Sequence, residues 1–182
     1  GYIRVEAFDK NNFTGASVPT NIISFALPRA LVPPNAPSLR IASVGGVTAP
    51  SNPLGSLQGV PDVIVPSSQP NPVTVNLEGA NLPIGTIVQV TLTPSTGNAT
   101  TVQSSGLAGT EAASTASASV TLPGGISVLS ASVVVDLTIA KAAPMFLDGE
   151  RVRRIEVAAT FGGASELTYV TESGRRIRQS TN

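Results

Sequence analysis

Few residues in this chain of 182 could carry out acid–base or nucleophilic chemistry. The sequence has no histidine and no cysteine, which removes the commonest general base and all thiolate and disulfide chemistry. A hydrolytic site would then need a Ser–Lys, Thr or carboxylate mechanism. Thr138 and Lys141 are three residues apart, which places them on opposite faces of a strand. Asp148 and Glu150 flank a glycine, a spacing that is more typical of a turn than of paired catalytic carboxylates. We therefore expect a protein that is not an enzyme.

Metal and cofactor motifs are incomplete as well. Asp9–Asn12 resembles the start of an oxygen-ligand loop, but Phe13 stands where the next ligand is needed, and no bidentate Glu follows at the required spacing. The chain contains no phosphate-binding loop and no GxGxxG motif. The sequence thus predicts no metal and no cofactor.

Two short groups of arginines near the C-terminus could contact a polyanion or a protein partner. They are Arg151, Arg153 and Arg154, followed by Arg175 and Arg176. Glutamates lie among them, and no aromatic residues alternate with them as single-stranded nucleic acid would require. A charge-paired sheet face is the simpler interpretation, and we expect no nucleic-acid partner.

The distribution of charge suggests a compartment. Charged residues make up 12% of the chain, and no Lys or Arg occurs between Arg40 and Lys141. Such a Ser-, Thr- and Asn-rich middle is typical of an exported module, so we expect an extracytoplasmic location: periplasm, cell surface or secreted. No apolar run approaches the ~18 residues of a membrane span. The chain begins with Gly rather than Met, which suggests that a leader or another domain precedes it.

Alternating apolar residues split by Gly and Pro predict an all-β protein. Residues 127–140 form the longest such run and are expected to be a central strand, or two strands joined by a kink. We divide the chain into four parts. Residues 1–32 are an N-terminal strand pair (the tail of a truncated domain or a sandwich edge), 33–60 a Pro/Gly-rich linker and loop, 61–142 an antiparallel β-sandwich, and 143–182 a C-terminal hairpin and tail packed on it.

Parity in the C-terminal hairpin predicts its register. If Val157 and Tyr169 face the same side, the loop has an odd length, and a three-residue loop at 162–164 places these two residues opposite each other. The same register places Arg154 opposite Glu172. The polar residues 173–182 are expected to fray, and the loop from Gly45 to Pro61 either crosses a sheet face or is mobile.

The stretch Asn71–Pro94, NPVTVNLEGANLPIGTIVQVTLTP, resembles the immunoglobulin-like modules of exported, mostly uncharacterised bacterial proteins. Its Leu-Pro-x-Gly-Thr turn followed by a Val-Thr-Leu-Thr-Pro strand carries the likeness, as does the lead-in PPNAPSL at 33–39. The resemblance covers about residues 35–140. It implies an immunoglobulin-like β-sandwich outside the cytoplasm, and it carries no site residue across.

Three functions follow as hypotheses. The first is a non-catalytic structural or adhesive module of a bacterial envelope, which binds envelope proteins or polysaccharide through loops at the sandwich end. The alternative is a carbohydrate-binding accessory module, although the chain has no Trp and only two Tyr. A second alternative is an enzyme with a carboxylate-based site.

Overall fold

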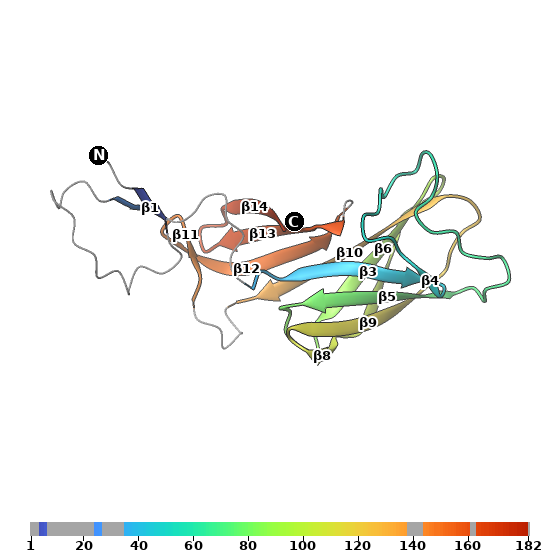
Figure 1. Cartoon of the computed structure of the whole chain (residues 1–182), viewed down its shortest axis with the longest axis horizontal. Helices are drawn as coiled ribbons and strands as arrows, with labels where there is room; N and C mark the ends of the chain where they lie inside the picture. Colours follow the sequence, from blue (N-terminus) through green and yellow to red (C-terminus); the bar gives the residue numbers. More distant parts are fainter. Residues whose placement is uncertain (1–3, 7–23, 27–34, 138–143, 161–162, 182) are drawn as a thin grey trace.

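The computed structural model describes residues 4–6, 24–26, 35–137, 144–160 and 163–181. These residues form strands connected by turns and loops, and the strands of the main body belong to two antiparallel sheets (Figure 1). The chain is therefore an all-β sandwich, as its alternating pattern predicted.

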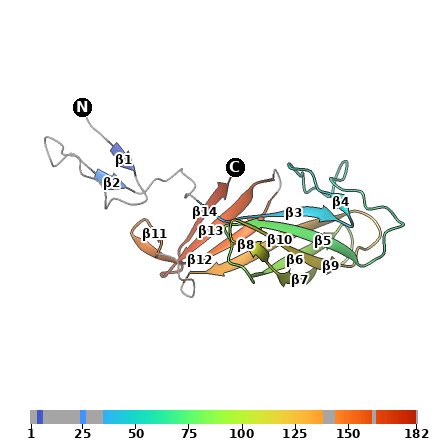
Figure 2. The same ribbon diagram turned by 60° about the horizontal axis from the view of Figure 1, so that its bottom comes forward.

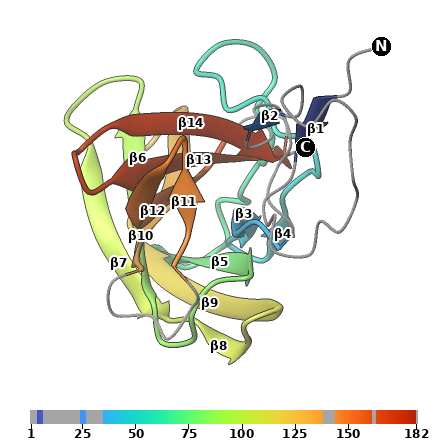
Figure 3. The same ribbon diagram turned by 90° about the vertical axis from the view of Figure 1, so that its left-hand side faces the viewer.

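The larger sheet has seven strands, and six of them follow one another in the order β14-β13-β12-β10-β6-β7. The seventh, β11, pairs with β12 alone. Viewed along the long axis, this sheet curls from β7 at one side to β14 at the top (Figure 3). Its strands are β6 (Ile87–Pro94), β7 (Thr100–Gly106), β10 (Ser127–Asp136), β11 (Phe146–Leu147), β12 (Glu150–Ala159), β13 (Ser165–Thr171) and β14 (Arg176–Thr181).

The second sheet has five strands in the order β4-β3-β5-β9-β8 and lies against the first (Figure 3). It contains β3 (Ser38–Val44), β4 (Val47–Thr48), β5 (Val73–Ala80), β8 (Ala108–Thr110) and β9 (Ala113–Val120). A further pair, β1 (Arg4–Glu6) and β2 (Ser24–Ala26), forms a small sheet of its own (Figure 2).

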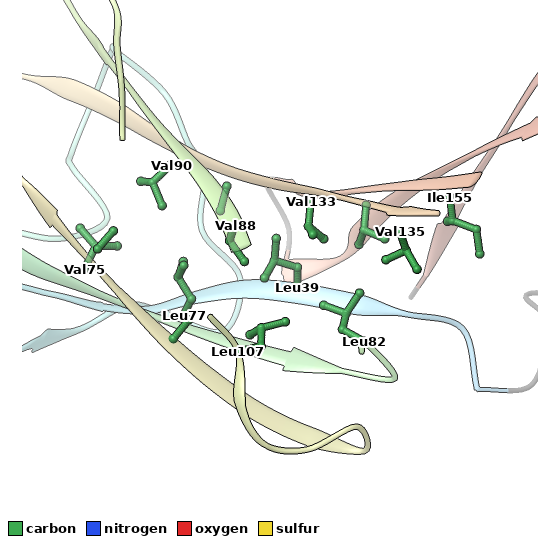
Figure 4. Close-up of a cluster of buried hydrophobic side chains, with 14 of the residues drawn as sticks. Leu39, Val75, Leu77, Leu82, Val88, Val90, Leu107, Val133, Val135 and Ile155 are labelled. Atoms are coloured by element: carbon green, nitrogen blue, oxygen red, sulfur yellow. The ribbon is translucent and has the colours of Figure 1, made fainter. Parts of the chain in front are cut away.

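The alternation of buried and exposed residues along the strands explains how the two sheets pack. Along β5 every second residue is buried, from Val73 to Leu77, and β9 repeats the pattern with small residues such as Ala116 and Ala118. Because successive side chains of a strand point to opposite faces, this period of two gives each sheet one apolar face. Aliphatic side chains from both apolar faces meet between the layers (Figure 4). The core is aliphatic because the chain has few aromatic residues.

Serine hydroxyls join the two sheets along both lateral seams. On one side Ser105 Oγ accepts the backbone N–H of Ser117, which links β7 to β9, at 3.1 Å. On the other side the buried Ser165 Oγ bonds both backbone groups of Leu39, which links β13 to β3. The seams use backbone groups that the strand ladders leave unpaired, and a buried group of this kind needs a partner.

The predicted central strand is confirmed. Residues 127–136 form one continuous strand, β10, which lies between β6 and β12 in the larger sheet. Residues 138–140 of the predicted segment lie outside the described part of the chain. Strands β5, β6 and β7 also lie within residues 61–142, the segment expected to form the sandwich.

The predicted register of the C-terminal hairpin is wrong by two residues. Val157 lies opposite Leu167, and Ile155 lies opposite Tyr169. The odd loop length is preserved, because Ala159 pairs with Ser165 and the Thr160 N–H donates to the Ala164 carbonyl.

The observed register places Arg154 opposite Val170 instead of its expected partner Glu172, and a β-bulge at Arg153 shifts the pairing once more from Val152 onward. Register shifts between Val152 and Arg154, so one extra residue enters β12. Glu172 consequently lies beside Arg151, whose carbonyl accepts the Glu172 N–H at 3.0 Å. The bulge also lets Val152 and Ile155 both be buried although they are three residues apart.

A further expectation is corrected. The C-terminal residues do not fray: Arg176–Thr181 form β14, which pairs with β13 over its whole length. In the N-terminal part, the described strands Arg4–Glu6 and Ser24–Ala26 pair in parallel, so these two strands are not joined as a hairpin.

Candidate functional site

The first arginine group that the sequence singled out lies at the end of the sandwich where β12 begins. Arg151 faces Glu172 at 3.6 Å, and Arg175 is paired with Asp148. Arg153 occupies the bulge, is exposed and forms no ion pair with a described residue. The structure thus brings Arg151 and Arg175 together at one end, each beside its own carboxylate.

The remaining arginines lie on the outer face of the larger sheet. Glu156 bridges Arg154, at 3.2 Å, and Arg176 on β14. Arg178 lies 3.7 Å from Glu166 on the neighbouring strand. The six arginines of β12–β14 and their connecting turns therefore stand among five carboxylates of residues 148–172. This pairing offsets most of their charge, as expected for a charge-paired face.

The carboxylates Asp148 and Glu150 belong to the same end. Hydrogen bonds from the side chains of Thr171 and then Ser173 hold the pKa of Glu150 below its ordinary value, and the Ser173 hydroxyl donates to it at 2.7 Å. A general acid needs a raised pKa, so this shift has the opposite sign to the one that glycoside hydrolysis would require. Asp148 is held by Arg175.

Other chemistry-bearing residues lie outside the described part of the chain: Thr138, Lys141, Phe13 and the Asp9–Asn12 loop. Within the described ranges, no group of three acidic side chains is arranged to hold a metal ion. No helix in those ranges is long and apolar enough to cross a membrane.

A large concavity of the described structure lies at the opposite end of the sandwich. It has a volume of about 830 Å³ and is open to solvent on one side. Its floor comes from both sheets, where Ile41 and Val73 of the smaller sheet meet Leu92 and Leu129 of the larger one. The connection between β4 and β5 forms its roof; it lies at the right-hand end in Figure 1, away from β11. We call this site the loop-end cleft.

The roof is anchored by apolar contacts. Val63 and Val65 are partly buried and pack against the core, although residues 61–66 form no strand. Val65 lies against Gly45, where an added Cβ would come within 2.9 Å of its Cγ1 and where φ is +56°. Glycine is therefore favoured at position 45 for two reasons: the lack of space for a Cβ and the left-handed backbone conformation. On the far side of the cleft, Gly163 lies directly against the carbonyl of Ser51.

A carboxylate fixes the outer part of the roof. The two oxygens of Asp62 accept the backbone N–H groups of Leu54 and Gly55, each at 2.8 Å. Hydrogen bonds to an ionised carboxylate are stronger than neutral ones. Asp62 thus closes residues 54–62 into a compact loop.

The other charged residue among the described lining residues is also engaged. The guanidinium of Arg40 donates to Glu78 of the adjacent strand at 2.7 Å. None of the described lining residues is aromatic. Tyr169, which could have served as a sugar platform, is fully buried in the core, and burial raises its pKa to about 12.

Exposed apolar side chains are frequent at the end of the sandwich that holds the cleft. Nine large apolar residues of the described structure are exposed, and five of them belong to this end of the sandwich. They are Leu54, Leu57, Val60, Ile64 and Ile126. An exposed apolar concentration beside a concavity is typical of an interaction site.

Sequence reasoning did not identify this cleft. It assigned residues 45–61 to a loop that crosses a sheet face or is mobile, and it started the sandwich near Pro61. The available signal was the alternation of Val63 and Val65 with Asp62 and Ile64, which indicates a segment with one buried side. Nothing in that pattern indicates that the segment covers the end of the sandwich rather than joining a sheet.

The class that the fold defines is an antiparallel β-sandwich with an apolar cleft at one end. No family model, curated protein or solved structure matches this chain. The immunoglobulin-like relationship therefore stays a prediction, and function has to be argued from the site itself.

Proposed function

We propose that this chain is a non-catalytic binding module of a bacterial envelope, acting outside the cytoplasm, and that its ligand occupies the loop-end cleft. The observation that carries this proposal is the cleft of about 830 Å³ between the ends of both sheets and the Asp62-anchored loop. This volume falls within the range of about 300–1,000 Å³ that is usual for ligand sites.

The side chains that line the cleft support a binding function rather than a catalytic one. Asp62 is its single carboxylate among described lining residues, and both of its oxygens are occupied by backbone N–H groups. Acid–base chemistry needs a group that can exchange a proton with the substrate. The lack of aromatic side chains among those lining residues disfavours the carbohydrate-binding alternative, since sugar platforms are normally aromatic.

A fluorescent dye tests whether the cleft binds ligands. We expect N-phenyl-1-naphthylamine, an uncharged apolar dye, to bind with saturation and with one site per chain. Ala159 is on the inner face of β12 and lines the cleft, so Ala159→Phe should fill it and weaken dye binding by about tenfold or more.

Ala158 provides the matched control. It is the next residue of the same strand, lies on the outer face opposite Ser132, and is not part of the cleft. Ala158→Phe should leave dye binding unchanged. Equal loss in both variants, or no saturable binding by the wild type, would count against the cleft as the binding site. Circular dichroism of both variants separates lost binding from lost fold.

A further inference from the structure

We infer that the loop-end cleft holds a linear aliphatic chain whose buried part carries no charge. This inference rests on the proposed function and adds the chemical class of the ligand. It depends on three features of the site: the composition of its walls, the state of its charged residues, and the apolar rim.

The walls are aliphatic. Ile41, Val44 and Leu129 line the floor, and Val63 and Val65 line the roof, together with several prolines of the loop. Aliphatic walls stabilise a ligand in proportion to the apolar area that it buries. They offer no aromatic side chain on which an aromatic or sugar ring of the ligand could stack. A hydrocarbon chain is the ligand class that gains most from such a surface.

The charged residues of the cleft disfavour a charged ligand group in its interior. Arg40 is paired with Glu78, and both oxygens of Asp62 already accept the backbone N–H groups of Leu54 and Gly55, so a charged ligand group would have to compete with these partners. Burial of an unpaired ion is strongly unfavourable. A phosphate, carboxylate or ammonium of the ligand must therefore remain outside the cleft.

Two exposed isoleucines, Ile64 and Ile126, form an apolar rim at the mouth of the cleft. Ile64 lines the cleft and is 70% exposed, while Ile126 at the turn before β10 also lines it and is 41% exposed. These side chains gain contacts only when a ligand continues from the cleft past its mouth. An elongated ligand fits this arrangement better than a compact one.

A chain-length series tests the inference by displacement of the bound dye. The probes are n-alkyl maltosides with tails of about eight to about twelve carbons, each used below its micellar concentration. Burial of one additional methylene should tighten binding roughly fourfold until the cleft is full. Maltose alone should displace nothing, which separates tail recognition from sugar recognition.

Head-group charge gives a second readout. Dodecanoate and dodecyltrimethylammonium, which carry opposite charges on the same tail, should bind within about threefold of each other because the head stays outside. A preference of tenfold or more for either sign would overturn the inference. So would affinity that does not depend on tail length, or tighter binding of an uncharged Val- and Ala-rich peptide than of dodecyl maltoside.

The rim variant Ile64→Ser removes apolar contact without disturbing a buried residue, and it should weaken the longest probe about fivefold. Its matched control is Ile84→Ser, in the turn between β5 and β6 at the other end, where no change is expected. The outcomes separate the two proposals. If the dye binds but alkyl chains of every length fail to displace it, the proposed function stands and the aliphatic inference falls. If the dye does not bind, both fall.

Discussion

The hydroxyl of Ser165 bonds both backbone groups of Leu39, a residue 126 positions earlier in the chain. It accepts the Leu39 N–H at 2.9 Å and donates to the Leu39 carbonyl at 3.0 Å, in a buried position. Ser165 belongs to the larger sheet and Leu39 to the smaller one, so one side chain closes the seam between them. In this way the β12–β13 hairpin is fixed to the sheet that forms half of the cleft floor.

Removing this hydroxyl should be costly. Ser165→Ala leaves a buried N–H and a buried C=O without partners, and we expect a loss of about 2–3 kcal/mol in the free energy of unfolding. Urea denaturation measures the loss. Ser132→Ala, at an exposed serine of β10, is the control and should change stability by less than about 0.5 kcal/mol. A comparable small effect at Ser165 would show that the seam does not depend on its hydroxyl.

Tyr169 should make the protein sensitive to alkali. Its side chain is fully buried, its hydroxyl has no hydrogen-bond partner among the residues that the structure describes, and burial raises its pKa to about 12. The unfolded chain ionises near pH 10, so the unfolded state loses its proton first. Stability is therefore unaffected below pH 10 and falls by about 1.4 kcal/mol per pH unit between pH 10 and 12.

Tyr169→Phe tests this assignment. The variant should lose this part of the pH dependence, and at neutral pH it should be as stable as the wild type or slightly more stable, because the substitution removes an unpaired buried hydroxyl. Urea titrations across the alkaline range measure both effects, with Tyr2→Phe as the control. An unchanged slope in Tyr169→Phe would assign the alkaline sensitivity to other groups.

Glu156 should contribute through its two arginine partners on the outer face. It bridges Arg154 and Arg176 and is half-buried. Glu156→Gln should cost about 0.5–1 kcal/mol at low ionic strength, and the difference should shrink at about 1 M salt, where charges are screened. Glu111→Gln, which removes an exposed carboxylate with no ion pair to a described residue, is the matched control. A cost that does not depend on salt would argue against an ion-pair origin.

Asp62 should control the order of the loop that roofs the cleft. Asp62→Asn replaces one of the two oxygens that accept the Leu54 and Gly55 N–H groups by a donor. Hydrogen exchange at these two amides should accelerate by about tenfold or more, because bonds to a charged acceptor contribute about 1.5–3 kcal/mol. Asp148→Asn, at the opposite end of the sandwich, should leave both amides unchanged. Unaltered exchange in Asp62→Asn would mean that other contacts hold the loop.

Much of the sandwich could be predicted because alternation reports directly on burial in half-buried strands. The run from Val73 to Leu77 and the run from Ser130 to Val135 both follow this rule. The hairpin register failed because the strands first pair at Ala159 and Ser165, a position that no local signal in the Gly-rich loop marks. The bulge at Arg153 then adds a one-residue shift that determines only the pairing from Val152 onward. β14 was missed because an edge strand buries only part of each side chain, which leaves the sequence of Arg176–Thr181 polar.

The cleft could not be predicted for a different reason. It depends on how a segment without secondary structure covers the ends of two sheets, which is a tertiary property. The arginines, in contrast, could be identified as a group, yet their partners depended on a register that the sequence did not determine. Arg151 and Glu172 illustrate this, since they meet only because of the bulge.

Isoleucine methyl shifts measured by NMR during titration with dodecyl maltoside test the central claim most directly. The sequence supplies its own controls, because Ile64 and Ile126 border the cleft whereas Ile84 and Ile87, exposed to 46% and 50%, lie at the other end. The account predicts saturable shifts for Ile41, Ile64 and Ile126 and none for the two distant residues. Equal shifts at both ends, or shifts confined to Ile84 and Ile87, would contradict it.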